Sequence, residues 1–220
     1  MLICEGLSKT YDTDRGPVAA IRGVNLTVNA GRYAAIIGRS GSGKSSLMAM
    51  IGGLSRPSAG CVKVAGTDLW SLGADARARF RARNIGYVFQ FASLLPTLRA
   101  LDNVALPLLL DGRGQGARER AAALLEEMGL GAHLDAFPSE MSAGEQRRVV
   151  IARALVGDPV LLLADEPTSD LDEETEREIM GLLERANRAR GTTLVLVTHN
   201  LALAAQAEQV IQVADGAVAP

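Results

Sequence analysis

The stretch Gly38-Arg39-Ser40-Gly41-Ser42-Gly43-Lys44-Ser45 matches the pattern G-x-x-x-x-G-K-[ST] of a phosphate-binding loop. Apolar residues 33–37 before it predict a buried strand, and residues 46–51 after it predict a helix. Glycines let backbone N–H groups curl around phosphate oxygens, and the helix N-terminus adds a partial positive charge. Lys44 can reach the β- and γ-phosphates, and the Ser45 hydroxyl can bind Mg²⁺. A chance glycine-rich turn is the weaker alternative, so the stretch predicts binding of a nucleoside triphosphate.

Composition narrows the class of protein. The 220 residues suffice for one large α/β domain or two small ones, and 48% of them are hydrophobic but only 4% aromatic. Such an aliphatic core is typical of buried parallel strands and their covering helices. The net charge of -2 argues against a general nucleic-acid binder, and we expect no nucleic-acid partner. Cys4 and Cys61 are isolated, which favours reduced thiols and the cytosol.

Hydrophobic periodicity predicts how the chain is organised. Period-two alternation predicts early antiparallel strands, and later apolar runs alternate with helical patterns. The expected strands are residues 24–28, 62–65, 85–89, 160–164, 193–197 and 210–213. The expected helices are residues 101–110, 118–128, 144–156, 173–189 and 201–207. We also expect no signal peptide and no apolar stretch long enough to span a bilayer.

These elements predict an α/β fold of the P-loop NTPase class. A mostly parallel core sheet is expected to carry helices on both faces, with an N-terminal antiparallel β-subdomain and an inserted α-helical subdomain. We expect a single domain over residues 1–220. Its nucleotide-binding core is expected over residues 1–91 and 157–220, and its helical subdomain over residues 92–156.

A second nucleotide motif is the run Leu161-Leu162-Leu163-Ala164 followed by Asp165 and Glu166. It predicts a core strand that delivers two acids at its C-terminal end, where ligands bind in open α/β sheets. Asp165 can hold Mg²⁺, commonly through a water, and Glu166 can polarise the water that attacks the γ-phosphate. Alone, the motif is usually a strand entering a capped turn. Together with the glycine-rich loop it predicts a site of hydrolysis.

The segment Met141-Ser142-Ala143-Gly144-Glu145 resembles the signature Leu-Ser-Gly-Gly-Gln of ATP-binding cassette (ABC) ATPases, and the resemblance covers essentially the whole chain. Ser142 can cap a helix whose free N–H groups face an anion. In the family that anion is the γ-phosphate held by the other subunit of a head-to-tail dimer. Ala143 and Glu145 depart from the family's glycine and glutamine, but neither change forbids the role. The alternative is a Ser-capped surface helix without a ligand.

Four smaller features match the same family. Gln90 is similar to the glutamine that contacts Mg²⁺ and the attacking water, although it could be a polar strand-end residue. Asp170 is similar to a residue of the loop that crosses the dimer interface, followed by Asp172, a possible helix cap. His199 is similar to the histidine that contacts the γ-phosphate. Tyr11 is similar to the aromatic residue that stacks on adenine, and packing at a strand end is its alternative.

The resemblance implies an ATPase that uses ATP and Mg²⁺ and pairs with a second copy of itself. It implies catalytic roles for Gln90, Glu166 and His199, and metal binding by Ser45, Gln90 and Asp165. It implies nucleotide contacts by Tyr11, Gly38, Arg39, Ser40, Gly41, Ser42, Gly43, Lys44, Ser45, Ser46, Ser142, Ala143, Gly144, Glu145 and Asp170.

Residues 87–98 and 101–107 are similar to cassettes of lipoprotein-releasing and macrolide-exporter-type systems, as is the long loop expected at residues 12–18. Those cassettes power membrane subunits that transmit motion to a periplasmic domain. The similarity implies a peripheral protein on the cytoplasmic face of the inner or plasma membrane. Its permease is expected to dock near residues 90–98. The apolar side chains expected to form that exposed patch, unless they pack inside the helical subdomain, are Phe91, Leu94, Leu95 and Leu98.

Other classes fit the chain less well. The ATPase subunit of an ABC importer is the main alternative, and a non-transport ABC ATPase is a weaker one. A chromosome-maintenance or repair ATPase would carry a long coiled coil between the two motifs, and a translation factor would carry two cassettes. A small-molecule kinase would lack His199 and residues 142–144. A silent binding module would be expected to lose Lys44 or Glu166, and neither is lost.

Overall fold

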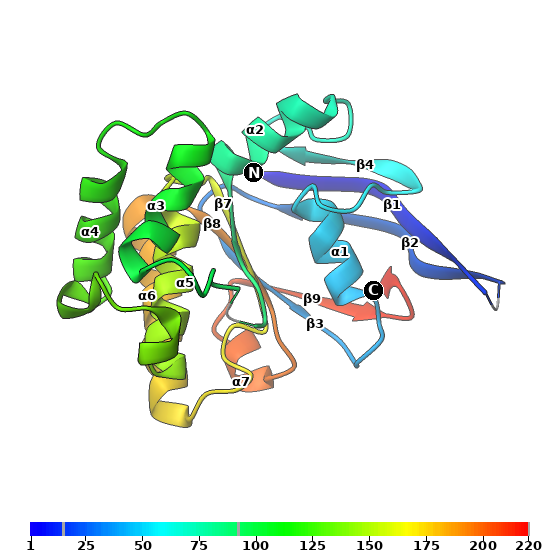
Figure 1. Ribbon diagram of the computed structural model, residues 1–220. Helices are drawn as coiled ribbons and strands as arrows, with labels where there is room; N and C mark the ends of the chain where they lie inside the picture. The colour runs from blue at the N-terminus through cyan, green and yellow to red at the C-terminus, as the bar shows by residue number, and fades with distance from the viewer. Residues whose placement is uncertain (15, 92, 220) are drawn as a thin grey trace.

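The computed structural model describes residues 1–14, 16–91 and 93–219 and contains two sheets flanked by helices (Figure 1). The smaller sheet is antiparallel, with strand order β2-β1-β4-β5. Its strands are β1 (Leu2–Thr13), β2 (Gly16–Val28), β4 (Ala59–Val64) and β5 (Thr67–Asp68). The predicted N-terminal antiparallel β-subdomain is therefore confirmed.

The larger sheet has strand order β10-β9-β3-β8-β7-β6, and all of its pairings are parallel except that of β10 with β9. Its strands are β3 (Tyr33–Ile37), β6 (Ile85–Val88), β7 (Leu161–Asp165), β8 (Thr193–Val197), β9 (Gln209–Ala214) and β10 (Ala217–Val218). Because parallel strands end at the same edge, the segments after β3, β6, β7 and β8 meet there.

Helices cover both faces of this sheet. Helix α1 (Lys44–Ile51) lies between the two sheets, and α3, α4, α5 and α6 gather on the opposite side (Figure 1). The remaining bounds are α2 (Ala74–Asn84), α3 (Ala100–Leu110), α4 (Ala117–Glu127), α5 (Ala143–Leu155), α6 (Glu173–Arg190) and α7 (Leu201–Ala204), with 3₁₀ turns at Gly131–His133 and Pro138–Glu140. In the ranges that the structure describes, no helix has the length and apolarity that crossing a membrane requires.

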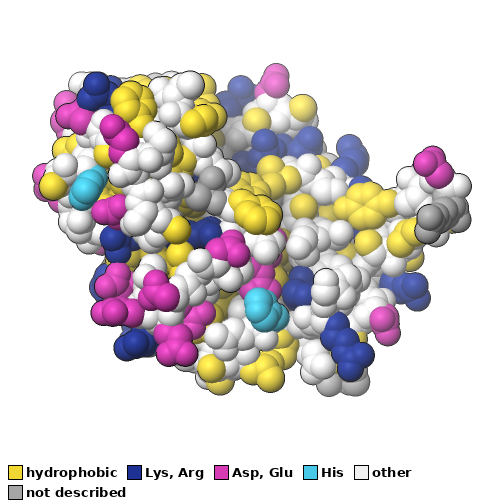
Figure 2. Space-filling model, turned by 60° about the horizontal axis from the view of Figure 1, so that its bottom comes forward, with side chains coloured by type: hydrophobic (Ala, Val, Ile, Leu, Met, Phe, Trp, Pro, Cys, Tyr) yellow, Lys and Arg dark blue, Asp and Glu magenta, His cyan; other side chains and the backbone are white. Residues whose placement is uncertain are grey.

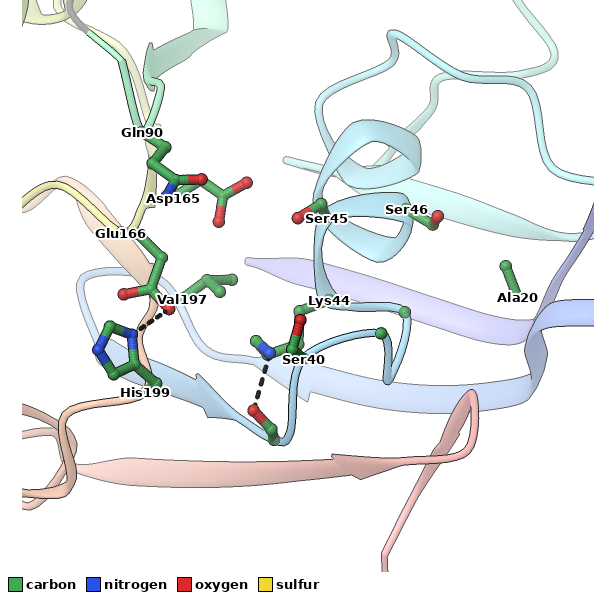
Figure 3. A pocket seen from close by; sticks show the side chains of 13 residues that line it. Ala20, Ser40, Lys44, Ser45, Ser46, Gln90, Asp165, Glu166, Val197 and His199 are labelled. Atoms are coloured by element: carbon green, nitrogen blue, oxygen red, sulfur yellow. Dashed lines mark hydrogen bonds and ion pairs between the residues drawn. The ribbon is translucent and has the colours of Figure 1, made fainter. Parts of the chain in front are cut away.

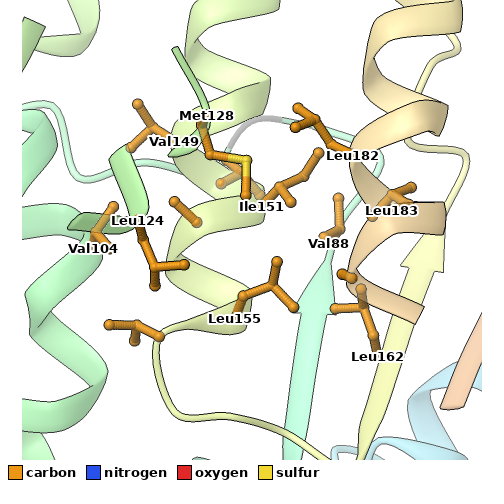
Figure 4. Close-up of a cluster of buried hydrophobic side chains, with 14 of the residues drawn as sticks. Val88, Val104, Leu124, Met128, Val149, Ile151, Leu155, Leu162, Leu182 and Leu183 are labelled. Atoms are coloured by element: carbon orange, nitrogen blue, oxygen red, sulfur yellow. The ribbon is translucent and has the colours of Figure 1, made fainter. Parts of the chain in front are cut away.

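Two apolar clusters form the core, one on each face of the larger sheet. Alternate residues of a strand point to opposite faces, so Leu161 and Leu163 join α1 and the smaller sheet while Leu162 joins the helical group. Figure 4 shows the cluster on the side of α3, α4, α5 and α6, in which Val88 and Leu162 from the strands meet side chains of the helices. Burial on both faces explains why the central strands are continuous apolar runs.

Two expectations about local structure were wrong, and one helix was not predicted. Of the expected loop at residues 12–18, residues 12–13 and 16–18 instead belong to β1 and β2, which stay paired up to Thr13 opposite Gly16 as a long hairpin; residue 15 lies outside the described ranges. Helix α2 was not predicted, and α7 ends at Ala204 instead of residue 207. In α2 arginine and alanine alternate, so no apolar stripe of helical period exists for a pattern to detect, and none of its residues is buried.

The contact between β6 and α5 gives a stability prediction. Gly86 is buried on β6, and a Cβ there would lie 2.4 Å from the carbonyl oxygen of Ala154 on α5. We expect Gly86→Ala to lower the free energy of unfolding by about 1–3 kcal/mol, the usual cost of overpacking. Urea unfolding measures the change.

The matched control is Gly73→Ala, because a Cβ at Gly73 meets no atom within 4 Å and its φ is -61°. This residue is the N-cap of α2, where glycine is preferred to alanine, so alanine should cost less than about 1 kcal/mol without any clash. Equal losses for the two variants would contradict the close packing of β6 on α5.

Candidate active site

A cavity of about 450 Å³ opens at the carboxyl edge of the larger sheet (Figure 3). Its walls come from β2, from the loop between β3 and α1, and from the ends of β6, β7 and β8. The lining residues are Ala20, Gly38, Ser40, Gly41, Gly43, Lys44, Ser45, Ser46, Gln90, Asp165, Glu166, Val197 and His199. The structure thus gathers residues that are more than 150 positions apart in the chain around one cavity.

The loop before α1 forms an anion-binding wall. Gly43 caps α1 at φ 101°, a left-handed conformation, and a Cβ there would lie 2.4 Å from the carbonyl oxygen of Ala20. No side chain caps this helix, so its first N–H groups, which have no partner within the helix, are free to bind an anion. The Lys44 ammonium donates to the carbonyl oxygens of Gly38, at 2.8 Å, and Arg39, at 3.0 Å. The wall therefore combines a positive charge with free N–H donors, as a phosphate requires.

The opposite wall is acidic and carries oxygen ligands. Burial raises the pKa of the Asp165 carboxyl, as does the charge of Glu166, while a hydrogen bond from Ser45 and the charge of Lys44 oppose the rise. A divalent cation beside Asp165 would instead lower the pKa of this carboxyl. The described residues contain no group of three or more His, Cys, Asp or Glu side chains that could hold a metal. The oxygens of Ser45, Gln90 and Asp165 fit Mg²⁺, which typically binds one or two carboxylates together with substrate phosphates.

Glu166 occupies a strained backbone position at the end of β7. Its φ of 45° is left-handed, which is uncommon for a residue with a side chain. Its N–H donates to the carbonyl oxygen of Val197 at 2.9 Å, which ties the turn to β8. Its Oε1 lies 3.0 Å from Nδ1 of His199, and Figure 3 shows both side chains at the cavity. The Glu166 side chain is 15% exposed and that of His199 is 72% exposed, so the pair joins a sheltered carboxylate to an open imidazole.

Some expected contacts lie beside the cavity. Arg39 and Ser42 line an adjoining cavity of about 420 Å³ together with residues 212–215. The Tyr11 ring is outside the lining, but its hydroxyl donates to Ser46 Oγ at 3.4 Å. The Ser46 hydroxyl is the principal cause of the lowered pKa of Tyr11. Tyr11 is therefore placed at the rim of the cavity.

The expected signature residues do not reach the cavity of the same chain. Ser142 caps α5, and its Oγ accepts from the N–H of Glu145 at 3.3 Å while the Ser142 N–H donates to Glu145 Oε2 at 2.8 Å. That backbone bond is the first cause of the lowered pKa of Glu145. Neither residues 142–145 nor Asp170 line the cavity described above. If they bind nucleotide, they bind it on another copy.

Two lining residues were not predicted, namely Ala20 and Val197. Val197 ends a strand that the sequence did predict, directly before Thr198 and His199, so its position could have been found. Ala20 comes from β2, far from any motif, and nothing in the sequence marks it.

Comparisons with known proteins agree on one family. The family described as ABC transporter matches residues 21–169. The lipoprotein-releasing system ATP-binding protein LolD of Geobacter metallireducens is 48% identical over 213 residues, which cover 96% of this chain and 95% of that protein. The macrolide export ATP-binding/permease protein MacB of Syntrophobacter fumaroxidans is 45% identical over 219 residues, which cover 98% of this chain but 31% of that protein. The chain thus spans about a third of the length of that MacB relative.

Solved structures give the same answer. The dimeric ATP-binding cassette MJ0796, in a post-hydrolysis state bound to ADP and Pi, superposes with a TM-score of 0.92 and 38% sequence identity. The match covers 100% of this chain and 97% of that one. The chain therefore belongs to the ABC transporter family, as one of its ATP-binding cassettes.

Proposed function

We propose that this protein is the ATP-hydrolysing subunit of an export-type ABC transporter and that it powers a separate membrane subunit from the cytoplasmic face of the membrane. The observation that carries the proposal is the arrangement of one cavity. It sets the Lys44 ammonium and the free N–H groups of α1 across from Asp165, Glu166 and Gln90. The similarity to LolD and MacB supports the export type.

Each side chain has a task that follows from its position. Lys44 and the N–H groups of α1 bind and orient the phosphates. Ser45, Gln90 and Asp165 hold Mg²⁺, which when bound neutralises charge on the phosphates. Glu166 accepts a hydrogen bond from the attacking water and takes its proton, and His199 fixes the orientation of that carboxylate through the 3.0 Å contact.

We further propose that two copies pair head to tail and enclose two nucleotides. The glycine-rich loop lies at the lower edge of Figure 1, and Figure 2 turns that edge toward the viewer. On this face acidic side chains predominate over the helical half and basic ones over the other half (Figure 2). A two-fold pairing would set each acidic half against a basic half, and both sites would form together.

Solution mass tests the pairing. We expect the Glu166→Gln protein to be a monomer alone and a dimer with Mg-ATP, because bound nucleotide would bridge the two copies. Ser142→Asp in the same background should abolish the dimer, since aspartate can still accept from the Glu145 N–H but its charge repels a phosphate. The melting temperature checks that the helix cap survives, because the Ser142 hydroxyl also donates to Glu145 Oε2. Light scattering gives the mass.

The control is Ser71→Asp, which adds the same charge at an exposed serine before α2. That variant should still form a dimer. A monomer at every protein concentration with Mg-ATP, or a dimer that survives Ser142→Asp, would refute the head-to-tail arrangement.

The segment after Gln90 is the proposed docking surface for the membrane subunit. Phe91 is 71% exposed and Leu95 is 43% exposed, whereas Leu94 packs partly against the helical core. The predicted exposed patch therefore includes Phe91 and Leu95. Leu94 instead packs in part inside the helical subdomain, which was the alternative for these side chains. The buried Asn103 side chain accepts from Leu95 N–H and donates to the carbonyl oxygens of Leu95 and Leu98, which holds the turn rigid. A rigid exposed apolar turn suits a partner helix.

Charged substitutions separate docking from packing. We expect Phe91→Asp and Leu95→Asp to abolish co-purification with the membrane subunit while ATPase activity and melting temperature are kept, since neither side chain is buried. Leu94→Asp is the matched variant, and it should instead lower the free energy of unfolding by about 1–3 kcal/mol. If the exposed variants still co-purify, the membrane subunit docks elsewhere.

A further inference from the structure

A buried arginine connects the helix that begins at Ser142 to the segment that carries Gln90. Arg147 lies on α5 and is only 4% exposed. Its Nη1 donates to the carbonyl oxygen of Phe89 and its Nη2 to that of Gln90, both at 2.7 Å. These two bonds span more than 50 positions of the chain and end on the residue that lines the candidate active site.

Burying this charge is costly. Within the ranges that the structure describes, its Nε has no hydrogen-bond partner. Burial lowers the pKa of the Arg147 guanidinium, and the charge of Asp170 opposes that shift only in part. A buried guanidinium bound to carbonyl oxygens instead of a carboxylate is a poor way to stabilise a core, where an apolar side chain would serve as well. A contribution to function accounts for it better.

The backbone that Arg147 holds has left its sheet. Strand β6 ends at Val88, so the carbonyl groups of Phe89 and Gln90 lie beyond the ladder. Arg153, further along α5, donates to the carbonyl oxygen and the hydroxyl of Ser93 at 2.8 Å each. Helix α5 thus holds this segment at two places. Buried side chains anchor the helix itself in the helical core, so these bonds link the position of the segment to the position of α5.

We propose that Arg147 is the positioning residue for Gln90. Through Arg147, Gln90 moves together with α5, the helix whose first residues face the partner copy in the proposed dimer. When the dimer closes on Ser142, the same movement of α5 places Gln90 at the nucleotide bound by its own chain. The inference rests on the proposed function. It adds that the geometry of Gln90 is set by the guanidinium of Arg147 and not by the end of β6.

The decisive experiment is a double-mutant cycle on ATP turnover. We expect Arg147→Gln to lower kcat by about 10- to 100-fold, the effect of misplacing a catalytic group by roughly 1 Å. The Kd for ATP, measured in the Glu166→Gln background, should change less than about twofold, because the loop before α1 is untouched. In a Gln90→Ala background Arg147→Gln should have no further effect on kcat, since nothing remains to be positioned.

Two further variants separate the loss of the two hydrogen bonds from a general effect of changing an arginine on α5. Arg147→Lys retains the charge but cannot reach both carbonyl oxygens with a planar fork, so it should rescue kcat only in part. It also replaces Arg147→Gln in the cycle if that variant does not fold. Arg148→Gln is the control on the next residue, where the guanidinium pairs with Glu178 on α6 and does not hold the segment of Gln90. That variant should keep wild-type kcat.

The outcomes are distinct. Independent, multiplying losses for Arg147→Gln and Gln90→Ala would overturn the inference, as would a loss of ATP affinity equal to the loss in kcat. Full activity of Arg147→Gln would overturn it as well. None of these results touches the proposed function, which fails separately if the wild-type protein does not hydrolyse ATP.

Discussion

Replacing Glu166 with glutamine is expected to lower the rate of ATP hydrolysis by about two to four orders of magnitude, the range for a positioned general base. The substitution keeps the size of the side chain and removes its charge. The left-handed backbone at φ 45° and the bond to Val197 should persist, so glutamine would occupy the same position. Only the acceptance of a proton from the attacking water is lost.

Single-turnover hydrolysis measures the chemical step, and equilibrium titration measures ATP binding. Binding should persist, because the loop before α1 is unchanged. Glu178→Gln is a suitable control, since it removes the same charge from the partly exposed pair with Arg148. Near-normal turnover in Glu166→Gln would assign the role of general base to another residue.

The sequence predicted the α/β core well because motif and periodicity agreed there. The apolar run at residues 161–164 is long enough for a buried strand and ends in Asp165, and the structure has β7 at that place. Hydrogen bonds between distant segments are invisible to periodicity. The length of the hairpin of β1 and β2 was missed for that reason, whereas α2 was missed because it carries no apolar stripe of helical period.

The members of the candidate site could be named from the sequence, but not their geometry. Gln90, Asp165 and His199 were predicted from the strands they follow, and parallel pairing places them at one edge of the sheet. Their roles stay predictions. Arg147 was not singled out, because no local pattern reveals that its guanidinium reaches the carbonyl groups of Phe89 and Gln90. Contacts of this kind depend on the packing of α5 against β6, which only the folded chain defines.

The separation of the two proposed phosphate-binding helix N-termini also follows from the fold. Ser142 lies at the start of α5, on the helical side of the sheet, while Lys44 lies at the start of α1, on the other side. Because residues 142–145 do not line the cavity that contains Lys44, one chain does not bring both helix N-termini to one phosphate. Affinity in the isolated chain must therefore come mainly from the loop of Lys44.

Lys44→Ala is accordingly expected to weaken ATP binding by about two to four orders of magnitude, since charged hydrogen bonds contribute about 1.5–3 kcal/mol each and the ammonium can make two. The fold should survive, because Lys44 is only half-buried and bonds to two carbonyl oxygens of its own loop. Titration of the folded variant with ATP measures the affinity, and its melting temperature checks the fold. Lys63→Ala is the control, because it removes an equal charge from β4, outside the cavity lining. Unchanged affinity in Lys44→Ala, or an equal loss in Lys63→Ala, would show that the phosphates do not bind where the free N–H groups of α1 point.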